Sequence, residues 1–201
     1  MKEKAEIITR VSEFVFALFK EHLSDSLVYH TYQHTELVAD TARKIAEGMK
    51  LGKEGIEVVT LAGWFHDTGY TEIHRGHEEV SIRIAKQFLK KDNYPEEKIE
   101  LIAGCIRATK IPQQPKNLLE EILADADLSG LGRKSFFEQS RLLRIELERA
   151  IGVTYTEEQW TQQNLDLLTS HKYFTSFAQD AFDNQQSENI RILSKELLKN
   201  Q

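Results

Sequence analysis

Cysteine and proline are scarce in this chain. Cys105 is the only cysteine among 201 residues, so no intramolecular disulfide can form, and we expect a protein of the reducing cytoplasm. Three prolines and ten glycines leave little room for linkers or for the many turns of an all-β fold. The length fits a single domain that is large enough to bury a substantial core.

Long apolar runs and an excess of basic charge are also absent. Charged residues such as Glu6 and Arg10 interrupt the apolar N-terminal stretch, and no run approaches the roughly 18 apolar residues of a membrane span. We therefore expect no membrane association. The net charge of −6 argues against an extended nucleic-acid surface, because neutralising phosphates requires clustered Lys and Arg. A small nucleotide bound through a metal ion remains compatible with this charge.

Several catalytic motifs are missing as well. The chain has no phosphate-binding GxxxxGK[ST] loop, no GxGxxG turn and no GxSxG nucleophile elbow. The HEE segment that begins at His77 is not an HExxH zinc motif, because Ser81 occupies the position of the second histidine. No run of alternating apolar and polar residues predicts a strand.

Apolar residues recur instead at helical spacing along most of the chain. Ile7, Val11 and Phe14 begin one such stripe, and the spacing predicts an all-α, compact, single-domain helical bundle. Ser135 with Glu138 and Thr156 with Gln159 have the spacing of capping boxes, which mark the starts of helices. The other expected helices follow the YHTYQH segment as far as Gly52, span about 53–67, 76–91, 95–111 and 117–128, and fill 175–198 as one helix or two.

Four residues with metal-binding side chains occur in the segments that are predicted to be helical. They are His34, the adjacent pair His66 and Asp67, and Asp127, each flanked by apolar residues. Imidazole and carboxylate ligands together suit a divalent transition metal, and a site with open positions can activate water. Asp125 competes with Asp127 for the last position. We favour Asp127 because Leu123, four residues earlier, marks the buried face of that helix.

The sequence around these residues resembles the HD superfamily of metal-dependent phosphohydrolases. The resemblance rests on YHTYQHTELV, AGWFHDTGY and LADADLSGLG and covers about 28–132. The later text, FFEQSRLLRIELE followed by HKYFT, resembles a subgroup of predicted HD-type phosphohydrolases of about this length. The resemblance implies one HD-like domain over 1–201, with the motif core at about 28–132 and C-terminal helices at 133–201.

The same resemblance implies a metal held between helices by His34, His66, Asp67 and Asp127. It also implies hydrolysis of phosphomonoesters or phosphodiesters, often nucleotides, so we expect a small phosphorylated substrate such as a nucleotide. Ligand types leave Mn, Fe, Co, Ni, Zn and Mg open, although histidine ligands favour a transition metal over Mg. One ion is expected, because LIAGCIRATK lacks the histidine that members with two metals carry in this region.

Catalytic and substrate-binding roles follow from this assignment. Asp67 is the expected acceptor of the proton from a metal-activated water, and Glu78 is a second candidate. His77, Arg107 and Lys110 are the expected contacts to the substrate phosphate. His77 opens a helix, and the free N–H groups of a helix N-terminus favour an anion.

Two other functions stay open at this stage. A few HD-like folds are iron oxygenases, but this reading needs a complete dinuclear ligand set, which the missing histidine disfavours. A non-catalytic helical module that binds a nucleotide or a partner is disfavoured by the intact ligands. The sequence leaves the substrate, the metal and the oligomeric state open, a homo-oligomer included.

Overall fold

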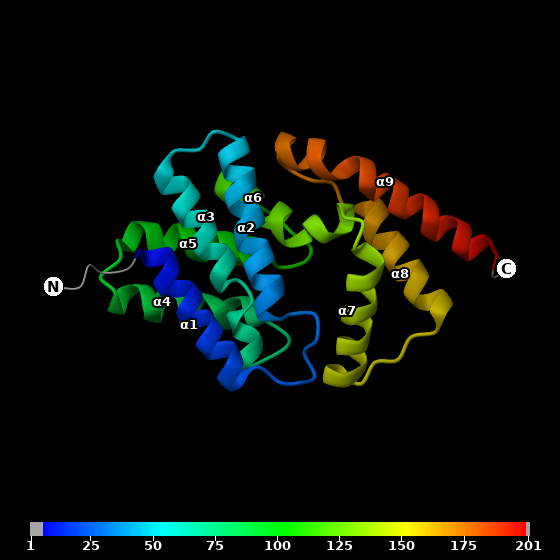
Figure 1. Cartoon of the computed structure of the whole chain (residues 1–201), viewed down its shortest axis with the longest axis horizontal. Coiled ribbons are helices and arrows are strands. Elements are labelled where there is room, and N and C mark those ends of the chain that lie inside the picture. Colours follow the sequence, from blue (N-terminus) through cyan, green and yellow to red (C-terminus); the bar gives the residue numbers. More distant parts are fainter. Residues whose placement is uncertain (1–5, 200–201) are drawn as a thin grey trace.

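The computed structural model describes residues 6–199, which form helices and no strand. This arrangement confirms the predicted all-α class and is shown in Figure 1. In chain order the elements are α1 (Ile7–His22), α2 (Tyr32–Gly48), α3 (Lys53–Phe65), the 3₁₀-helix η1 (Thr68–Thr71), α4 (His77–Lys91), α5 (Glu96–Ala108), α6 (Leu118–Asp127), the 3₁₀-helix η2 (Leu128–Gly132), α7 (Phe136–Ile151), α8 (Glu157–Ser170) and α9 (Ser176–Lys199).

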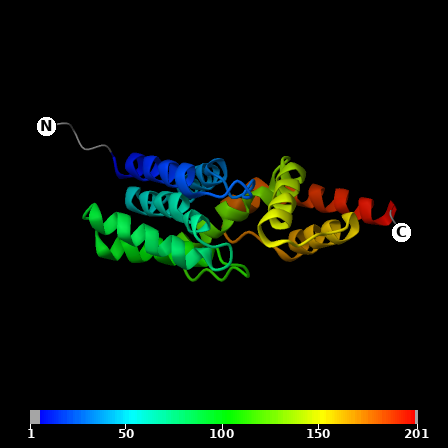
Figure 2. The same ribbon diagram turned by 90° about the horizontal axis from the view of Figure 1, so that it is seen from below.

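The molecule is elongated, with α1–α6 gathered in one half and α7, α8 and most of α9 in the other (Figures 1 and 2). Helix α3 is the centre of the first half, since it packs against α1, α2, α5 and α6. Every residue of its VVTLAGWF segment, Val58–Phe65, is buried. A helix that is apolar on all sides must be enclosed by other elements, and this one carries the principal hydrophobic core.

Gly63 allows α2 and α3 to approach closely. A Cβ atom at this position would lie 2.6 Å from the Cα of Ala39 on α2, nearer than two such atoms can come. The contact therefore requires glycine. It also fixes the position of His34 on α2 relative to His66, which follows α3.

The second half has a smaller apolar cluster of its own, formed by Leu131, Phe136, Leu168 and Leu193. Buried polar contacts join it to the first half. The carboxylate of Asp125 on α6 accepts hydrogen bonds from the backbone N–H groups of Phe174 and Thr175, which lie just before α9, both at 2.8 Å. We propose that the two halves act as one domain, as the sequence predicts.

Several helix boundaries differ from the predicted ones. The third helix ends at Phe65 rather than at Asp67, and the second begins at Tyr32, inside the YHTYQH segment. The capping box at Thr156 is confirmed by both of its hydrogen bonds. The one predicted at Ser135 is wrong, because its side chain makes no capping bond although the helix starts there. The segment after Thr175 forms one helix. Of the helices described, none is at once long and apolar enough to cross a membrane.

Candidate metal centre

The end of α3 explains how two adjacent residues can face one point. Successive residues of a helix point about 100° apart, but α3 stops at Phe65 and the backbone changes at Asp67 (φ −102°, ψ 3°). The Nδ1–H of His66 donates to the carbonyl oxygen of Gly63 at 2.7 Å. This bond fixes the tautomer of His66 and leaves Nε2 free as a ligand atom.

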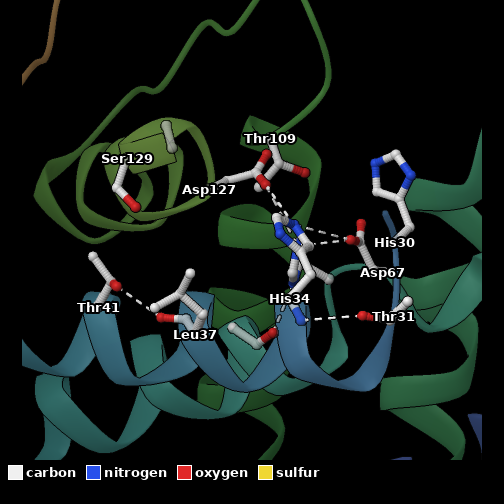
Figure 3. Close-up of polar contacts among 12 residues, drawn as sticks. His30, Thr31, His34, Leu37, Thr41, Asp67, Thr109, Asp127 and Ser129 are labelled. Atoms are coloured by element: carbon white, nitrogen blue, oxygen red, sulfur yellow. Dashed lines mark hydrogen bonds and ion pairs between the residues drawn. The ribbon is translucent and has the colours of Figure 1, made fainter. Parts of the chain in front are cut away.

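Four side chains converge at this point, from α2, the α3–η1 turn and the end of α6. Figure 3 labels three of them, His34, Asp67 and Asp127. Nε2 of His34 lies 3.4 Å from Asp67 Oδ2 and 3.6 Å from Asp127 Oδ1. Nε2 of His66 lies 3.1 Å and 3.5 Å from the same two oxygens. One ligand atom from each of His34, His66 and Asp127 falls within 4.8 Å of the others, so this group could hold a metal ion.

The hydrogen bonding of these atoms fits a cation. Nε2 of His34, Nε2 of His66 and Oδ2 of Asp67 are buried, and none has a hydrogen-bond partner in the described part of the chain. Buried polar atoms are normally paired. Three buried atoms without a hydrogen bond that converge on one point, all of them ligand types for divalent transition metals, therefore fit a group that could hold an ion.

The pKa values of the group show how its charges interact without an ion. Burial by itself lowers the pKa of His66, but the charges of Asp67 and Asp127 outweigh this and hold it well above its ordinary value. Burial raises the pKa of both carboxyl groups, but the neighbouring histidines outweigh it, lowering the pKa of Asp67 and bringing that of Asp127 to about 2. A proton on His66 thus provides the positive charge that a metal would otherwise supply.

Asp125, the competing aspartate, lies elsewhere. It is fully buried, and its carboxylate accepts hydrogen bonds from the backbone N–H groups of Phe174 and Thr175, both at 2.8 Å, and from Thr175 Oγ1 at 2.7 Å. These bonds fasten the segment before α9 to α6. The choice between Asp125 and Asp127 stays a prediction, and the two positions give it a sharp test.

A cavity of about 440 Å³ opens beside the four converging side chains. Asp67 and Asp127 line its inner end. The wall around them comes from Tyr29, His30, Tyr70, His74, Arg75, Gly76, His77, Glu78, Thr109, Lys110, Ile111, Leu128, Gly130 and Leu131. The opposite wall comes from α7 and α8 through Phe136, Gln139, Ser140, Leu143, Leu147, Asn164 and Leu167.

The predicted substrate contacts divide between this cavity and the surface. His77, Glu78 and Lys110 line the cavity, and His77 Nε2 lies 3.5 Å from Asp67 Oδ1. The guanidinium of Arg107 instead pairs on the surface with Glu79 at 2.9 Å, and Arg107 is not among the lining residues. The structure therefore does not bring Arg107 together with the other three.

Sequence reasoning missed one buried acidic residue near the cavity. Glu146 on α7 is fully buried and bonds to Nδ1 of His30. Its position in FFEQSRLLRIELE carries no signal for this contact, because the two residues lie 116 positions apart. For His30 the sequence carries a weak indication of a role near the site, because it lies four residues before His34.

Comparisons with known proteins agree with this geometry. The family model described as HD domain matches residues 31–129, a segment that contains all four converging residues. The crystal structure of Bacillus subtilis YpgQ in complex with ADP matches with a TM-score of 0.66 over 94% of this chain and 97% of that chain, at 16% identity. At this identity the likeness shows the fold alone. No curated protein matches the chain.

Proposed function

Because residues 31–129 make this chain a member of the HD family, we propose that it is a metal-dependent phosphohydrolase acting on a nucleotide or another small phosphate ester. The observation that carries this proposal is the convergence of His34, His66, Asp67 and Asp127 on one point, with three of their ligand atoms buried and unpaired. Members of the family are generally metal-dependent hydrolases.

The chemistry proposed for these side chains follows from their positions. A divalent ion held by them would polarise a phosphoryl oxygen and lower the pKa of a bound water. Oδ2 of Asp67 faces the two imidazoles, whereas Oδ1 lies 3.5 Å from His77. The carboxylate can thus serve the ligand group through one oxygen and accept a proton from the attacking water through the other. Glu78, buried and lining the cavity, is a second candidate for this role.

The cavity has the two environments that a nucleotide needs. Its volume of about 440 Å³ lies within the range of roughly 300–1,000 Å³ for small-molecule sites. The basic side chains among its lining are His30, His74, Arg75, His77 and Lys110. The apolar side chains that η2, α7 and α8 contribute to the lining are Leu128, Leu131, Phe136, Leu143, Leu147 and Leu167. A phosphate would lie at the basic end, and a ring would pack on the apolar wall.

The structural neighbour supports the nucleotide reading. The YpgQ structure was solved in complex with ADP, a ligand with both a charged diphosphate and a flat ring. A nucleotide would place its phosphates beside Arg75 and Lys110 and its base against Leu143 and Leu147. The free amide of Gln139 on the same wall offers both a donor and an acceptor to a base edge.

A substrate panel with several metals tests this proposal. The purified protein should hydrolyse at least one member of a set of nucleoside mono-, di- and triphosphates, cyclic nucleotides and simple phosphate esters when Mn, Fe, Co, Ni, Zn or Mg is supplied. Asp67→Ala should abolish the activity, and Asp180→Ala, at an exposed position on α9, should keep it. Nucleotide binding without any hydrolysis would instead indicate a non-catalytic module.

A further inference from the structure

Glu146 is a buried carboxylate with an unusual set of partners. It is fully buried on α7 and lies beyond residues 31–129, the segment matched by the HD family. One oxygen, Oε2, accepts hydrogen bonds from the backbone N–H groups of Tyr29 (2.8 Å) and His30 (3.0 Å). The other oxygen, Oε1, bonds to Nδ1 of the His30 ring. A buried carboxylate is costly unless its bonds are satisfied, and His30 supplies the only side-chain partner among residues 6–199.

These contacts fix the imidazole of His30 in one orientation. Because a carboxylate only accepts, Nδ1–H donates to Glu146. The ion pair with this buried carboxylate stabilises the imidazolium form of His30, in which Nε2–H is left to donate to a phosphoryl oxygen. The ring is also clamped by Tyr70, which stacks on it with centroids 4.1 Å apart. Tyr70 is stacked in turn on His77 at 3.9 Å. Rotation of the His30 ring would break both its bond to Glu146 and its stacking.

The imidazole held in this way lies beside the candidate ligand residues. His30 lines the cavity together with Asp67 and Asp127, and its ring centroid is 5.7 Å from that of His34. In the view of Figure 3, Asp67 lies between His34 and His30. No hydrogen-bond partner contacts Nε2 of His30 within the described chain. A phosphoryl group bound in this cavity beside the ligand residues would therefore lie near this ring.

We infer that His30 contacts the phosphoryl group of the substrate through its cavity-facing nitrogen, and that Glu146 is the positioning residue that orients it. This inference rests on the proposed phosphohydrolase function and adds to it a residue pair that the HD segment alone does not contain. The alternative is a purely structural tie, in which Glu146 fastens the loop before α2 to α7 and the ring only fills space. The two interpretations differ in whether Nε2 of His30 contributes to catalysis.

His30→Asn separates these readings. The asparagine side-chain NH₂ can take the position of Nδ1 and keep the bond to Glu146, but no atom reaches the position of Nε2. We expect the variant to keep the wild-type metal content and melting temperature, while kcat falls on the order of 10- to 100-fold. His22→Asn, at an exposed histidine on α1, is the matched control and should keep the wild-type kcat.

Glu146→Gln tests the positioning role. The glutamine oxygen can keep the two backbone N–H bonds, which turns its NH₂ toward Nδ1 and leaves the ring as the neutral Nε2–H tautomer. The contact of His30 with a phosphoryl oxygen then loses its positive charge. We expect kcat to fall by a similar factor, and the double variant with His30→Asn to be little slower than either single variant, since both changes remove one function. NMR of ¹⁵N-labelled histidine should report this change of protonation directly. A merely structural tie would produce no such loss in His30→Asn.

The outcomes are distinguishable from a failure of the proposed function. Wild-type hydrolysis that His30→Asn retains at full kcat would overturn this inference and leave the phosphohydrolase standing. Loss of metal from His30→Asn would overturn it too, because His30 would then belong to the ligand group. If the wild-type protein hydrolyses no phosphate ester with any metal, the proposed function fails and this inference fails with it. If Glu146→Gln does not fold, His30→Asn alone decides.

Discussion

Asp125 and Asp127 lie two residues apart on α6, and exchanging each for asparagine should affect two different properties. Asp125→Asn should lower stability and leave metal binding intact. The asparagine oxygen can replace one carboxylate oxygen, but its NH₂ then faces a donor of Phe174 or Thr175. A buried donor left unsatisfied costs about 1–3 kcal/mol, and the loss of charge from the remaining bonds adds roughly 1 kcal/mol. The melting temperature should fall by about 5–15 °C.

Asp127→Asn should have the opposite effect. Its carboxylate oxygen lies 3.6 Å from His34 Nε2 and 3.5 Å from His66 Nε2. Two unit charges about 4 Å apart attract each other by about 4 kcal/mol at an effective dielectric constant of about 20. Removing this charge should therefore weaken metal affinity by roughly 1,000-fold. The melting temperature of the metal-free protein should fall less than in Asp125→Asn, since no backbone N–H group of the described residues loses its acceptor.

The assay combines metal analysis of the purified variants, titration calorimetry and thermal unfolding. Unfolding has to be measured with a chelator present, because a bound metal would itself raise the melting temperature. The reasoning predicts a crossed result, with stability lost in one variant and metal lost in the other. An Asp125→Asn protein that loses its metal while an Asp127→Asn protein keeps it would refute the assignment and mean that the ligand position is two residues earlier.

Three further outcomes are expected. Lys110→Ala should raise KM about tenfold, because a cation leaves the cavity wall, whereas Arg107→Ala, whose guanidinium pairs on the surface, should leave KM unchanged; equal effects in steady-state kinetics would contradict this. Metal affinity measured by calorimetry should fall by up to about tenfold per pH unit as the pH is lowered below the raised pKa of His66, since binding then displaces a proton from this ring; a flat profile would refute this. Gly63→Ala should cost about 1–3 kcal/mol, because its Cβ would lie 2.6 Å from Ala39 Cα; an unchanged denaturant midpoint would refute the close approach.

Local patterns predicted the helices well because a helix is a local structure. The stripe that includes Val11 reports a buried face directly, and the Thr156 capping box depends only on residues three apart. The predicted box at Ser135 failed because the right residue types at the right spacing do not determine side-chain rotamers. The end of α3 was placed two residues late, since apolar periodicity continues through Phe65 and gives no sign of the turn that follows.

The candidate site was predictable only where its residues carry a motif. The four ligand candidates could be predicted because they lie in short, contiguous sequence motifs such as FHDTG. Contacts between distant residues have no such signature. The bond between Glu146 and His30 spans 116 positions, and that between Asp125 and Thr175 spans 50. Arg107 is close to the motif in sequence, but its guanidinium pairs with Glu79 on the surface, which the sequence alone does not indicate.

The two halves of the molecule meet at α6 and η2, and both contribute residues to the cavity. Asp127 at the end of α6 faces the ligand group, whereas Asp125 one half-turn earlier holds the segment that leads into α9. Residues 31–129 can thus supply the metal ligands while the helices that follow supply the opposite wall and Glu146. A change in how α7–α9 dock would therefore move the substrate wall and the His30 ring without moving the ligands. Substitutions on α7 and α8 should consequently change KM or kcat and leave the metal content unchanged.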